Sequence, residues 1–458
     1  MANSELDRRL TLFPVTNIVV ANMIGAGIFT TTGLLMQDLH NPLVMLVLWL
    51  VGGAIALCGA LCYARLGAAM PEAGGEYTFL SRLYHPLAGF LSGWVSLIAG
   101  FSAPIAASAI GCSEYTFRAF PGFSAAILGP GSLNEAWAKR LISLLIIAVF
   151  TGVHLRGIEF GSRVQNVLTI LKVLLIAGLI VVGFSVGHGD WIHVTSGRPF
   201  AFSGGNWQTI GLSLTWIMFA YSGWNAATYI GSEIKNPMKN ILASLLLGTG
   251  IVTVIYVFMN LFYIYAVDPQ SMEGVISIAG LAVGRAFGPG LDSLVSVLIA
   301  FALFSSLSAY IILGPRVYFA MARDGVFFRG LATVDVTSRA PSRAILLQGA
   351  IASLLVLTSS FDQILTYMGF SLGIFPLLAV ASLFKLRRMR HGFVPAGGYL
   401  LIPSVYLIAG AMMLILTFFE RPLESSLAVV TVLTGIPAFR AFQKRPIPES
   451  KETDGTLE

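Results

Sequence analysis

Two long apolar stretches of the sequence carry glycines and polar side chains at their centres. The first reads TLFPVTNIVVANMIGAGIFTTTGLLMQ, with Gly25 and Gly27 in its middle. The second reads TIGLSLTWIMFAYSGWNAATYIGSEI, with Ser222 and Asn225 near its middle. Glycine costs about 1 kcal/mol relative to alanine inside a helix, and polar groups at the mid-depth of a bilayer cost more unless they face protein or water. The pattern predicts that both stretches are helices interrupted halfway along.

An interrupted helix offers backbone groups that can bind a ligand. N–H groups at the start of the outer half carry partial positive charge, and C=O groups at the end of the inner half carry partial negative charge. We expect the N–H groups of Ala26, Gly27 and Ile28 to bind a carboxylate. Four residues are placed to offer C=O groups to an ammonium: Met23, Ile24, Phe219 and Ser222. A carboxylate and an ammonium bound side by side describe an α-amino acid.

The composition indicates where such helices lie. Hydrophobic residues make up 56% of the 458 residues and charged residues 11%, which is less than half of the ~25% charged fraction of an ordinary soluble domain. So few charges cannot cover the surface of a soluble globule of this size, and a disordered chain would be far more polar. A transmembrane barrel would show short alternating segments instead of these long apolar runs. The sequence predicts an all-α integral membrane protein.

Each membrane span needs about 20 apolar residues. Twelve stretches meet this requirement, at residues 12–37, 42–69, 85–115, 138–155, 160–187, 207–233, 239–266, 287–320, 342–360, 362–384, 398–419 and 423–442. Twelve spans place both termini on one side of the membrane. Most of the 28 Lys and Arg residues then fall on that side, which the positive-inside rule assigns to the cytoplasm.

The two interruptions divide the chain into halves. One opens the first five spans and the other opens the next five, which suggests an inverted repeat of five plus five helices with a binding site between the repeats. Close helix packing is the alternative explanation of such glycines. The expected parts are a cytoplasmic segment (1–11), the first repeat (12–187), the second repeat (207–384), helices 11 and 12 (398–442) and a disordered cytoplasmic tail (443–458).

Other classes of function find little support in the sequence. The three cysteines and six histidines show no spacing typical of a metal site. No cluster of catalytic groups is visible either, so we expect no metal, no cofactor and no enzymatic activity. An ion channel is the alternative from a different class, and it would need a pore lined by rings of carbonyls or charges. A site for both a carboxylate and an ammonium favours a carrier.

Four motifs carry a family resemblance. They are GAGIF at 25–29, PEAGGEY at 71–77, FAYSGWNA at 219–226 and RDG at 323–325. In this order they resemble the amino acid–polyamine–organocation superfamily over residues 10–442. FAYSGWN and the lysine in VQNVLTILKVLLIAGLI are most similar to the L-amino acid transporter branch. The resemblance implies the LeuT fold, sodium-independent transport and often obligatory exchange of amino acids.

The resemblance also implies roles for individual residues. It assigns contacts with the substrate carboxylate to Ala26 and Gly27, and contacts with the amine to Phe219 and Ser222. Trp224 and Asn225 lie toward the substrate side chain. Ala26 stands where many members of the branch have serine, so a hydroxyl contact is absent while the backbone N–H remains. Asn225 is neutral and neither GAGIF nor YSGWN contains an acidic residue, which predicts neutral amino acids as substrates. A proton-coupled or cationic amino acid or polyamine permease is the alternative.

Lys172 lies about nine residues past Arg163, the last charge before the fifth span. At 1.5 Å per residue it is ~13 Å deep, near the middle of the membrane. Its side chain either snorkels to the interface or places its ammonium against the interrupted first helix. In the second case it occupies the position where sodium-driven relatives hold sodium, as a tethered cation that makes the ion unnecessary. A desolvated lysine also loses its proton more readily, which leaves proton coupling open.

The expected partners and location follow from the same resemblance. Animal members of the branch carry an outer cysteine between the third and fourth spans, which forms a disulfide with a single-span partner. Residues 116–137 contain no cysteine, so we expect no disulfide-linked partner subunit. We expect a multi-pass protein of the plasma (inner) membrane that binds an amino acid substrate and lipid. The basic residues on the cytoplasmic side require no nucleic acid.

Overall fold

The computed structural model describes residues 6–120, 135–200, 204–275, 278–288, 291–358, 361–389 and 401–443. These residues contain helices and no strand, and their only β pairings are two isolated bridges, Leu10–Ile234 and Ala73–Ile230. Ten helices of the described chain are long and apolar enough to cross a bilayer. The protein is therefore a multi-pass membrane protein. Of the tail predicted to be disordered (443–458), Gln443 is the last residue of α18 and the rest lies outside the described residues.

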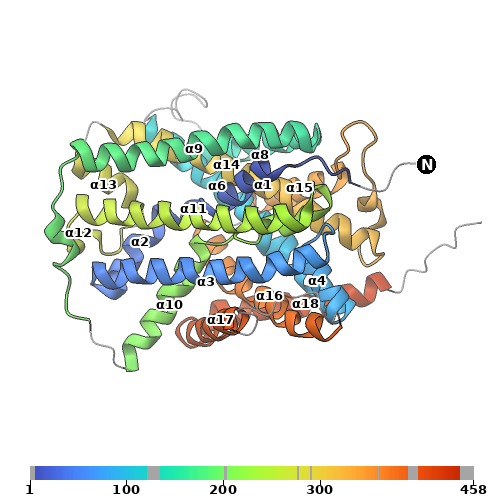
Figure 1. The fold of residues 1–458 in the computed structure, drawn as a ribbon. Helices are drawn as coiled ribbons and strands as arrows, with labels where there is room; N and C mark the ends of the chain where they lie inside the picture. Colours follow the sequence, from blue (N-terminus) through green and yellow to red (C-terminus); the bar gives the residue numbers. More distant parts are fainter. Residues whose placement is uncertain are drawn as a thin grey trace, which may run out of the picture.

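The elements run roughly side by side along the long axis of the molecule (Figure 1). In chain order they are α1 (Leu12–Met23), α2 (Ala26–Leu39), α3 (Pro42–Ala69), α4 (Glu76–Leu83), α5 (Pro86–Val95), the π-helix η1 (Ser96–Ser102), α6 (Ala103–Ala119), α8 (Glu135–Leu155), α9 (Ile158–Val186), η2 (Trp191–Val194), α10 (Gly204–Ala220), η3 (Ala226–Tyr229), η4 (Gly231–Glu233), α11 (Pro237–Ala266), α12 (Pro269–Met272), α13 (Ile278–Phe287), α14 (Asp292–Arg323), η6 (Arg329–Ala332), α15 (Ser342–Thr358), α16 (Phe361–Met389), α17 (Leu401–Glu420) and α18 (Pro422–Gln443). Helices α5, η1 and α6 form one continuous candidate span, and α15 is a shorter apolar helix.

Local sequence sets where the long helices begin. The side chain of Asn41 accepts a hydrogen bond from the backbone N–H of Val44, and Pro42 occupies the first helical position of α3. Both features favour a helix start. Pro237 plays the same part at the start of α11. The start expected at residue 42 therefore coincides with the observed one.

The helical backbone is interrupted at both predicted positions. Helix α1 ends at Met23 and α2 begins at Ala26. Helix α10 ends at Ala220, and a turn leads into the 3₁₀ helix η3. Within this turn Gly223 has a φ angle of +102°, which glycine adopts without the cost that other residues incur. The two interruptions supply the exposed backbone groups on which a ligand site can be built.

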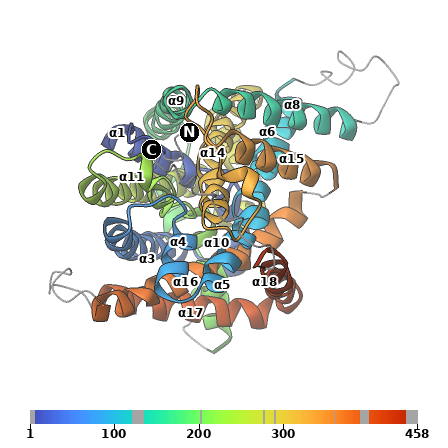
Figure 2. The same cartoon turned by 90° about the vertical axis from the view of Figure 1, so that its right-hand side faces the viewer.

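Inner and outer helices differ in burial. In the most apolar part of Leu12–Leu39 and of Pro86–Phe117, 83% of residues are buried, against 22% for Ile158–Val186. Seen along the helices, α14 and α10 lie inside a ring that includes α8, α9, α3 and α17 (Figure 2). The interrupted helices therefore belong to the inner layer, and the outer helices present apolar side chains to lipid.

Helix α9 shows how one helix serves both layers. Gln165, Thr169 and Lys172 are buried, whereas Val167 and Leu174 are 57% and 61% exposed. The buried residues follow the spacing of three and four that places side chains on one helix face. This face packs against α1 and α14, so the lysine points into the protein.

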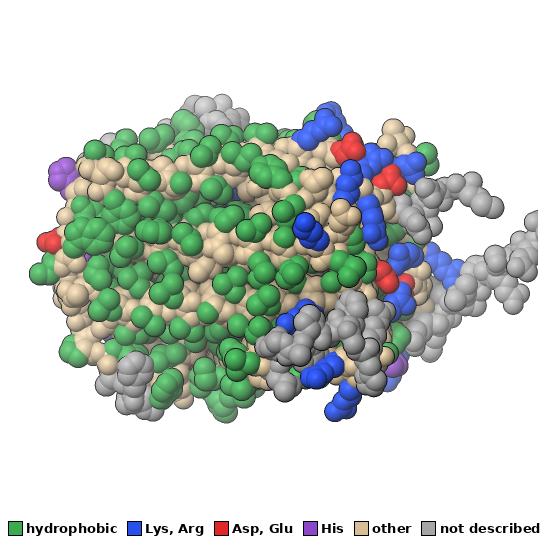
Figure 3. All heavy atoms as spheres, viewed as in Figure 1, with side chains coloured by type: hydrophobic (Ala, Val, Ile, Leu, Met, Phe, Trp, Pro, Cys, Tyr) green, Lys and Arg blue, Asp and Glu red, His purple; other side chains and the backbone are tan. Residues whose placement is uncertain are grey.

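The surface divides in the same manner. Apolar side chains cover the middle of the molecule, and Lys and Arg side chains gather at the end where the N-terminal segment lies (Figure 3). Some of these charges pair with acidic groups, as Arg9 does with Glu159 at 2.8 Å. A band of apolar surface with a basic rim at one end matches what a bilayer requires.

Candidate substrate-binding site

The two interruptions lie against each other. A Cβ atom added to Gly27 would lie 2.7 Å from the Cα of Ala220, and one added to Gly223 would collide with Asn22. The hydroxyl of Tyr256 lies 2.7 Å from the carbonyl oxygen of Met23 and 2.8 Å from that of Ala220. Glycine therefore allows a close approach that a side chain would prevent, and Tyr256 connects the ends of α1 and α10.

Lys172 holds the end of α1 from the opposite side. Its ammonium donates hydrogen bonds to the carbonyl of Ile24 at 2.6 Å, the hydroxyl of Ser306 at 3.0 Å and the carbonyl of Ala21 at 3.2 Å. These three bonds use all three donors of the ammonium. The side chain is fully buried, so it does not extend to the membrane surface.

The carbonyl of Ile24 is already occupied in this arrangement. It accepts bonds from Lys172 and, at 2.6 Å, from the hydroxyl of Ser306. A carbonyl oxygen has two lone pairs, so the predicted ammonium contact at Ile24 requires one of these donors to leave. The carbonyl of Phe219 accepts one backbone bond, from Ser222 at 3.0 Å, and keeps one lone pair.

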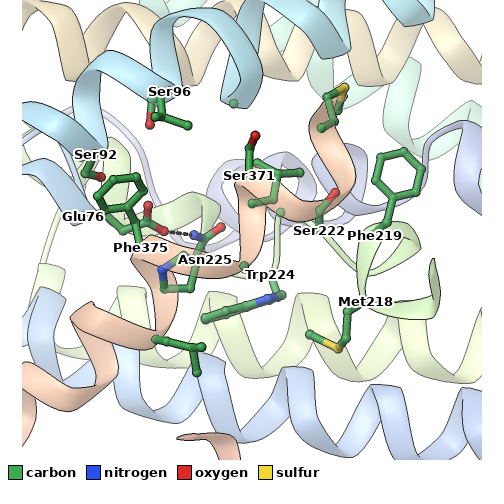
Figure 4. A pocket seen from close by; sticks show the side chains of 18 of the residues that line it. Glu76, Ser92, Ser96, Met218, Phe219, Ser222, Trp224, Asn225, Ser371 and Phe375 are labelled. Atoms are coloured by element: carbon green, nitrogen blue, oxygen red, sulfur yellow. Dashed lines mark hydrogen bonds between the residues drawn. The ribbon is translucent and has the colours of Figure 1, made fainter. Parts of the chain in front are cut away.

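A cavity opens beside the second interruption (Figure 4). Four of the predicted site residues line it: Phe219, Ser222, Trp224 and Asn225. From the first interruption Asn22 reaches it. Met23, Ile24, Ala26, Gly27, Ile28 and Lys172 are not among the described lining residues. The structure thus brings the second half of the predicted site to the cavity and sets the first half behind it.

Two aromatic rings fix the indole of Trp224. Its centroid lies 4.8 Å from that of Tyr63 and 5.6 Å from that of Tyr406, both in edge-to-face contact. Such contacts are favourable for aromatic pairs. The indole therefore forms a fixed wall of the cavity.

Glu76 is a lining residue that the sequence did not reveal. It follows the second predicted span, yet it is 6% exposed and faces the cavity. Its carboxylate oxygen Oε1 accepts bonds from Tyr63 and Asn225, each at 2.8 Å, and from Tyr229 at 3.1 Å. In the structure Gly74 and Gly75, with φ angles of +112° and +53°, turn the chain back toward η3, where the N–H of Gly74 donates to the carbonyl of Tyr229 at 3.1 Å.

Serines complete the polar lining, at Ser92, Ser96 and Ser371. No group of three or more His, Cys, Asp or Glu residues that could hold a metal ion occurs in the described part of the chain. The chemistry that this site offers is hydrogen bonding to a small polar ligand beside two helix ends.

Comparisons with known proteins agree with this reading. The model of the amino acid permease family matches residues 10–436. The chain is 28% identical to the Asc-type amino acid transporter 1 of Mus musculus, over 95% of this chain and 81% of the relative. It is also 28% identical to the large neutral amino acids transporter small subunit 2 of Homo sapiens, over 95% and 80%.

A third relative is also an amino acid transporter by name. The b(0,+)-type amino acid transporter 1 of Mus musculus is 25% identical over 96% of this chain and 89% of the relative. The family match covers nearly the whole chain and includes both interruptions and Lys172. The chain belongs to the amino acid permease family, within the amino acid–polyamine–organocation superfamily.

Proposed function

We propose that this protein is a sodium-independent amino acid transporter that works by alternating access and exchanges neutral L-amino acids. The observation that carries the proposal is the pair of touching helix interruptions beside a cavity that both polar and apolar side chains line. The names of the relatives describe amino acid transporters, which supports the same substrate class. The matched family is one of permeases, and we propose no enzymatic activity.

The substrate carboxylate binds at the start of α2. Gly25 has no side chain to cap the first turn, and the first N–H groups of a helix have no intrahelical partner. Those of Ala26, Gly27 and Ile28 are therefore the proposed ligands of the carboxylate, although these residues do not line the cavity in this structure. Helix starts of this kind favour anions. The amine binds the free lone pair of the Phe219 carbonyl and the hydroxyl of Ser222, and the side chain extends toward Trp224 and Asn225.

Lys172 supplies the cation that makes sodium unnecessary. Its ammonium sits among the carbonyls of Ala21 and Ile24 and the hydroxyl of Ser306, a set of oxygens that suits a small cation. Because the charge is tethered, the binding of α1 to α9 and α14 does not depend on ion concentration. Phe219 closes the cavity as a gate over the substrate.

The proposed topology has twelve spans in two inverted repeats of five, residues 12–187 and 207–384, followed by two further helices at 398–442. Both termini lie in the cytoplasm and the protein resides in the plasma (inner) membrane. The basic side chains at the N-terminal end support this orientation (Figure 3). We expect no disulfide-linked subunit, since Cys112 is buried and donates to the carbonyl of Ala300 at 3.1 Å.

Counterflow in proteoliposomes tests the proposal. Vesicles loaded with one unlabelled amino acid receive a labelled neutral amino acid outside, with either sodium or choline as the external cation. Trapped neutral amino acids should accelerate uptake equally in both salts, and vesicles without protein supply the baseline. A requirement for sodium, or uptake that ignores the trapped amino acid, would overturn the proposal.

A further inference from the structure

A strip of exposed basic side chains crosses the end of the molecule where the N-terminal segment lies. Its members are Arg8, Arg156, Arg163, Lys235 and Lys239. We propose that this basic strip binds anionic phospholipids of the adjoining membrane leaflet, which is the cytoplasmic one in the proposed topology. The strip lies on the outer surface of the protein, so its ligand does not depend on the contents of the substrate cavity.

Backbone hydrogen bonds bring the parts of the strip together. The N–H groups of Arg9 and Leu10 donate to the carbonyl of Glu233, each at 2.9 Å. The N–H of Lys235 donates to the carbonyl of Leu10 at 2.8 Å. On its other side the N-terminal segment reaches α9, where the guanidinium of Arg9 donates to Glu159 at 2.8 Å. The segment therefore joins the start of α9 to the start of α11, and the basic residues of all three belong to one surface.

The acidic groups beside the strip are bound to other cations. Asp7 lies 2.8 Å from Arg9, which also pairs with Glu159. Glu233 is buried and pairs with Arg316 at 2.7 Å. Within the described part of the chain, no acidic side chain forms an ion pair with any member of the strip. The strip thus presents positive charge to its surroundings.

The position of Arg163 shows that the strip faces lipid. It shares one face of α9 with exposed apolar residues that recur at spacings of three and four, namely Phe160, Val167, Leu171 and Leu174. On a membrane helix such a stripe contacts acyl chains. A guanidinium at the end of the stripe lies at the level of the lipid phosphates, and it can bind a phosphate through two parallel hydrogen bonds.

Arg156 belongs to the same side of α9. Its guanidinium carbon lies 5.3 Å from the ring centroid of Phe160, which is within the range of a cation–π contact. Since Phe160 and Arg163 are three positions apart on one helix face, the ring keeps the charge of Arg156 on the side that carries Arg163. Two guanidinium groups therefore border one apolar stripe.

The other end of the strip combines charge and apolar surface in the same way. Lys239 lies three positions before Leu242 on α11, and both side chains are exposed. Helix α1 packs against both α9 and α11 (Figure 1), and its Phe13 is 57% exposed. Lysine stems can lie along apolar surface while the ammonium stays at the headgroups. The strip and its apolar border therefore extend from α9 across α1 to α11.

An anionic phospholipid suits both parts of this surface. Lys and Arg side chains border the apolar middle of the molecule at this end (Figure 3). Basic side chains next to a membrane attract anionic headgroups, and the attraction falls off within a Debye length. A soluble anion would satisfy the charges but leave the apolar border uncovered, whereas a lipid covers it with its acyl chains.

Headgroups bound to the strip restrain the elements that hold α1. Helix α9 carries Lys172 and α11 carries Tyr256, and their side chains bind the carbonyls at the end of α1. The N-terminal segment leads directly into α1. A headgroup shared between two of these elements opposes their separation, so anionic lipid should raise the temperature at which the protein unfolds.

The experiment uses the purified full chain in a mild detergent and compares lipids that differ only in the headgroup. Phosphatidylglycerol or phosphatidylcholine with the same acyl chains is added. Native mass spectrometry counts the bound lipid, and intrinsic fluorescence follows thermal unfolding. The wild type should retain several-fold more phosphatidylglycerol than phosphatidylcholine and should unfold several degrees higher with it. Equal retention of the two lipids, or the same stabilisation by glycerol phosphate, which has no acyl chains, would overturn the proposal.

Double variants locate the lipid. Arg163→Gln with Lys239→Gln should reduce the retention of phosphatidylglycerol to that of phosphatidylcholine, whereas Arg163→Lys with Lys239→Arg should keep the preference because the charges remain. Lys385→Gln with Arg388→Gln removes two exposed charges from the end of α16 and should retain lipid like the wild type.

The controls separate the strip from net charge and from transport. If the α16 variant loses the preference as fully as the strip variant, the lipid responds to net charge and the basic strip is not its site. All variants should unfold at the wild-type temperature without added lipid, because the substituted side chains are exposed. These measurements need no transport, so a failure of counterflow would refute the proposed function, and a failure of lipid retention would refute only the basic strip.

Discussion

The two helix interruptions are built from similar residues but are held in different ways. At the first, the carbonyls of Met23 and Ile24 are bound by side chains from three other helices, through Tyr256, Lys172 and Ser306. At the second, the backbone groups of the turn after Ala220 bond to one another, as in the bond from Ala226 N–H to the Gly223 carbonyl at 3.0 Å. Tyr256 is the side chain of another helix that reaches a carbonyl there, that of Ala220. The first interruption is therefore anchored to the scaffold, whereas the second presents its side chains to the cavity.

This difference assigns different duties to the two halves of the site. An anchored interruption can present backbone N–H groups in a constant geometry, which suits the carboxylate that all amino acids share. An interruption with side chains in the cavity can distinguish substrates. Ser222, Trp224 and Asn225 line the cavity, so their side chains decide which substrate side chains fit, and they take no part in the anchor at Met23 and Ile24. Changes at the anchor should reduce transport of every substrate, and changes at the second interruption should alter selectivity.

The largest effect is expected from removing the anchor. Lys172→Ala removes the Lys172 donor from the carbonyl of Ala21 and one of the two donors from the carbonyl of Ile24. An unsatisfied buried group costs roughly 1–3 kcal/mol. Uptake of every substrate should fall by an order of magnitude or more, as measured in the counterflow assay. Lys172→Arg should rescue poorly, because a planar guanidinium does not fit a compact ion site.

Lys139 provides the control for Lys172. It pairs with Glu114 at 2.6 Å near the surface, so Lys139→Ala should transport like the wild type. Near-normal uptake by both Lys172 variants would show that the ammonium is dispensable and would remove the anchor from the mechanism.

The next largest effect on uptake is expected at Gly27, and the neighbouring Gly25 serves as its control. In Gly27→Ala the added Cβ meets the Cα and Cβ of Ala220 at 2.7 Å, so α2 and α10 must move apart. Overpacking of this kind costs roughly 1–3 kcal/mol, and Gly27→Val should abolish uptake altogether. In Gly25→Ala the nearest atom is the hydroxyl of Ser306 at 3.8 Å, an ordinary contact. Equal uptake by Gly25→Ala and Gly27→Ala would contradict the close approach at Gly27.

A change at the second interruption should act on selectivity. Asn225→Asp replaces the amide that donates to Glu76 at 2.8 Å by a second carboxylate. Transport of neutral amino acids should weaken several-fold, and arginine and lysine should become better competitors, since like and opposite charges at close range differ by several kcal/mol. Competition curves for neutral and cationic amino acids measure the shift. An unchanged profile would place Asn225 outside the substrate pocket.

The sequence predicted the interruptions and the depth of Lys172 from local features, and it left open whether the lysine snorkels to the interface or turns inward. Glycines mark where a helix ends, and depth along a span places the lysine near the interruption. The position of Glu76 in the cavity was beyond sequence reasoning because its burial depends on distant parts of the chain, which contribute Tyr63, Asn225 and Tyr229. A residue that follows a span looks solvated until the glycine turn before it is known to fold back.

The same limit applies to the anchored carbonyls. Ile24 offers a carbonyl at a helix end, which the sequence correctly places at the interruption. Whether that carbonyl faces the cavity or the scaffold depends on Ser306, which lies 282 positions along the chain. Spacing within one helix predicts which groups are exposed by an interruption, and only the packing of other helices decides which of them a substrate can reach.

The smallest effect is expected at the link between the two interruptions. Tyr256→Phe removes the hydroxyl that lies 2.7 and 2.8 Å from the carbonyls of Met23 and Ala220 but keeps the buried ring. One lost hydrogen bond costs about 1 kcal/mol, so uptake should fall by less than in Lys172→Ala, with a modest loss of thermal stability. Tyr263→Phe is the matched control, because that hydroxyl lies 3.5 Å from the carbonyl of Ile28, at the limit of a hydrogen bond. If Tyr256→Phe and Tyr263→Phe show the same uptake and thermal stability, packing at Gly27 and Gly223 holds the ends of α1 and α10 together. The hydroxyl of Tyr256 then contributes nothing to the difference between the two interruptions.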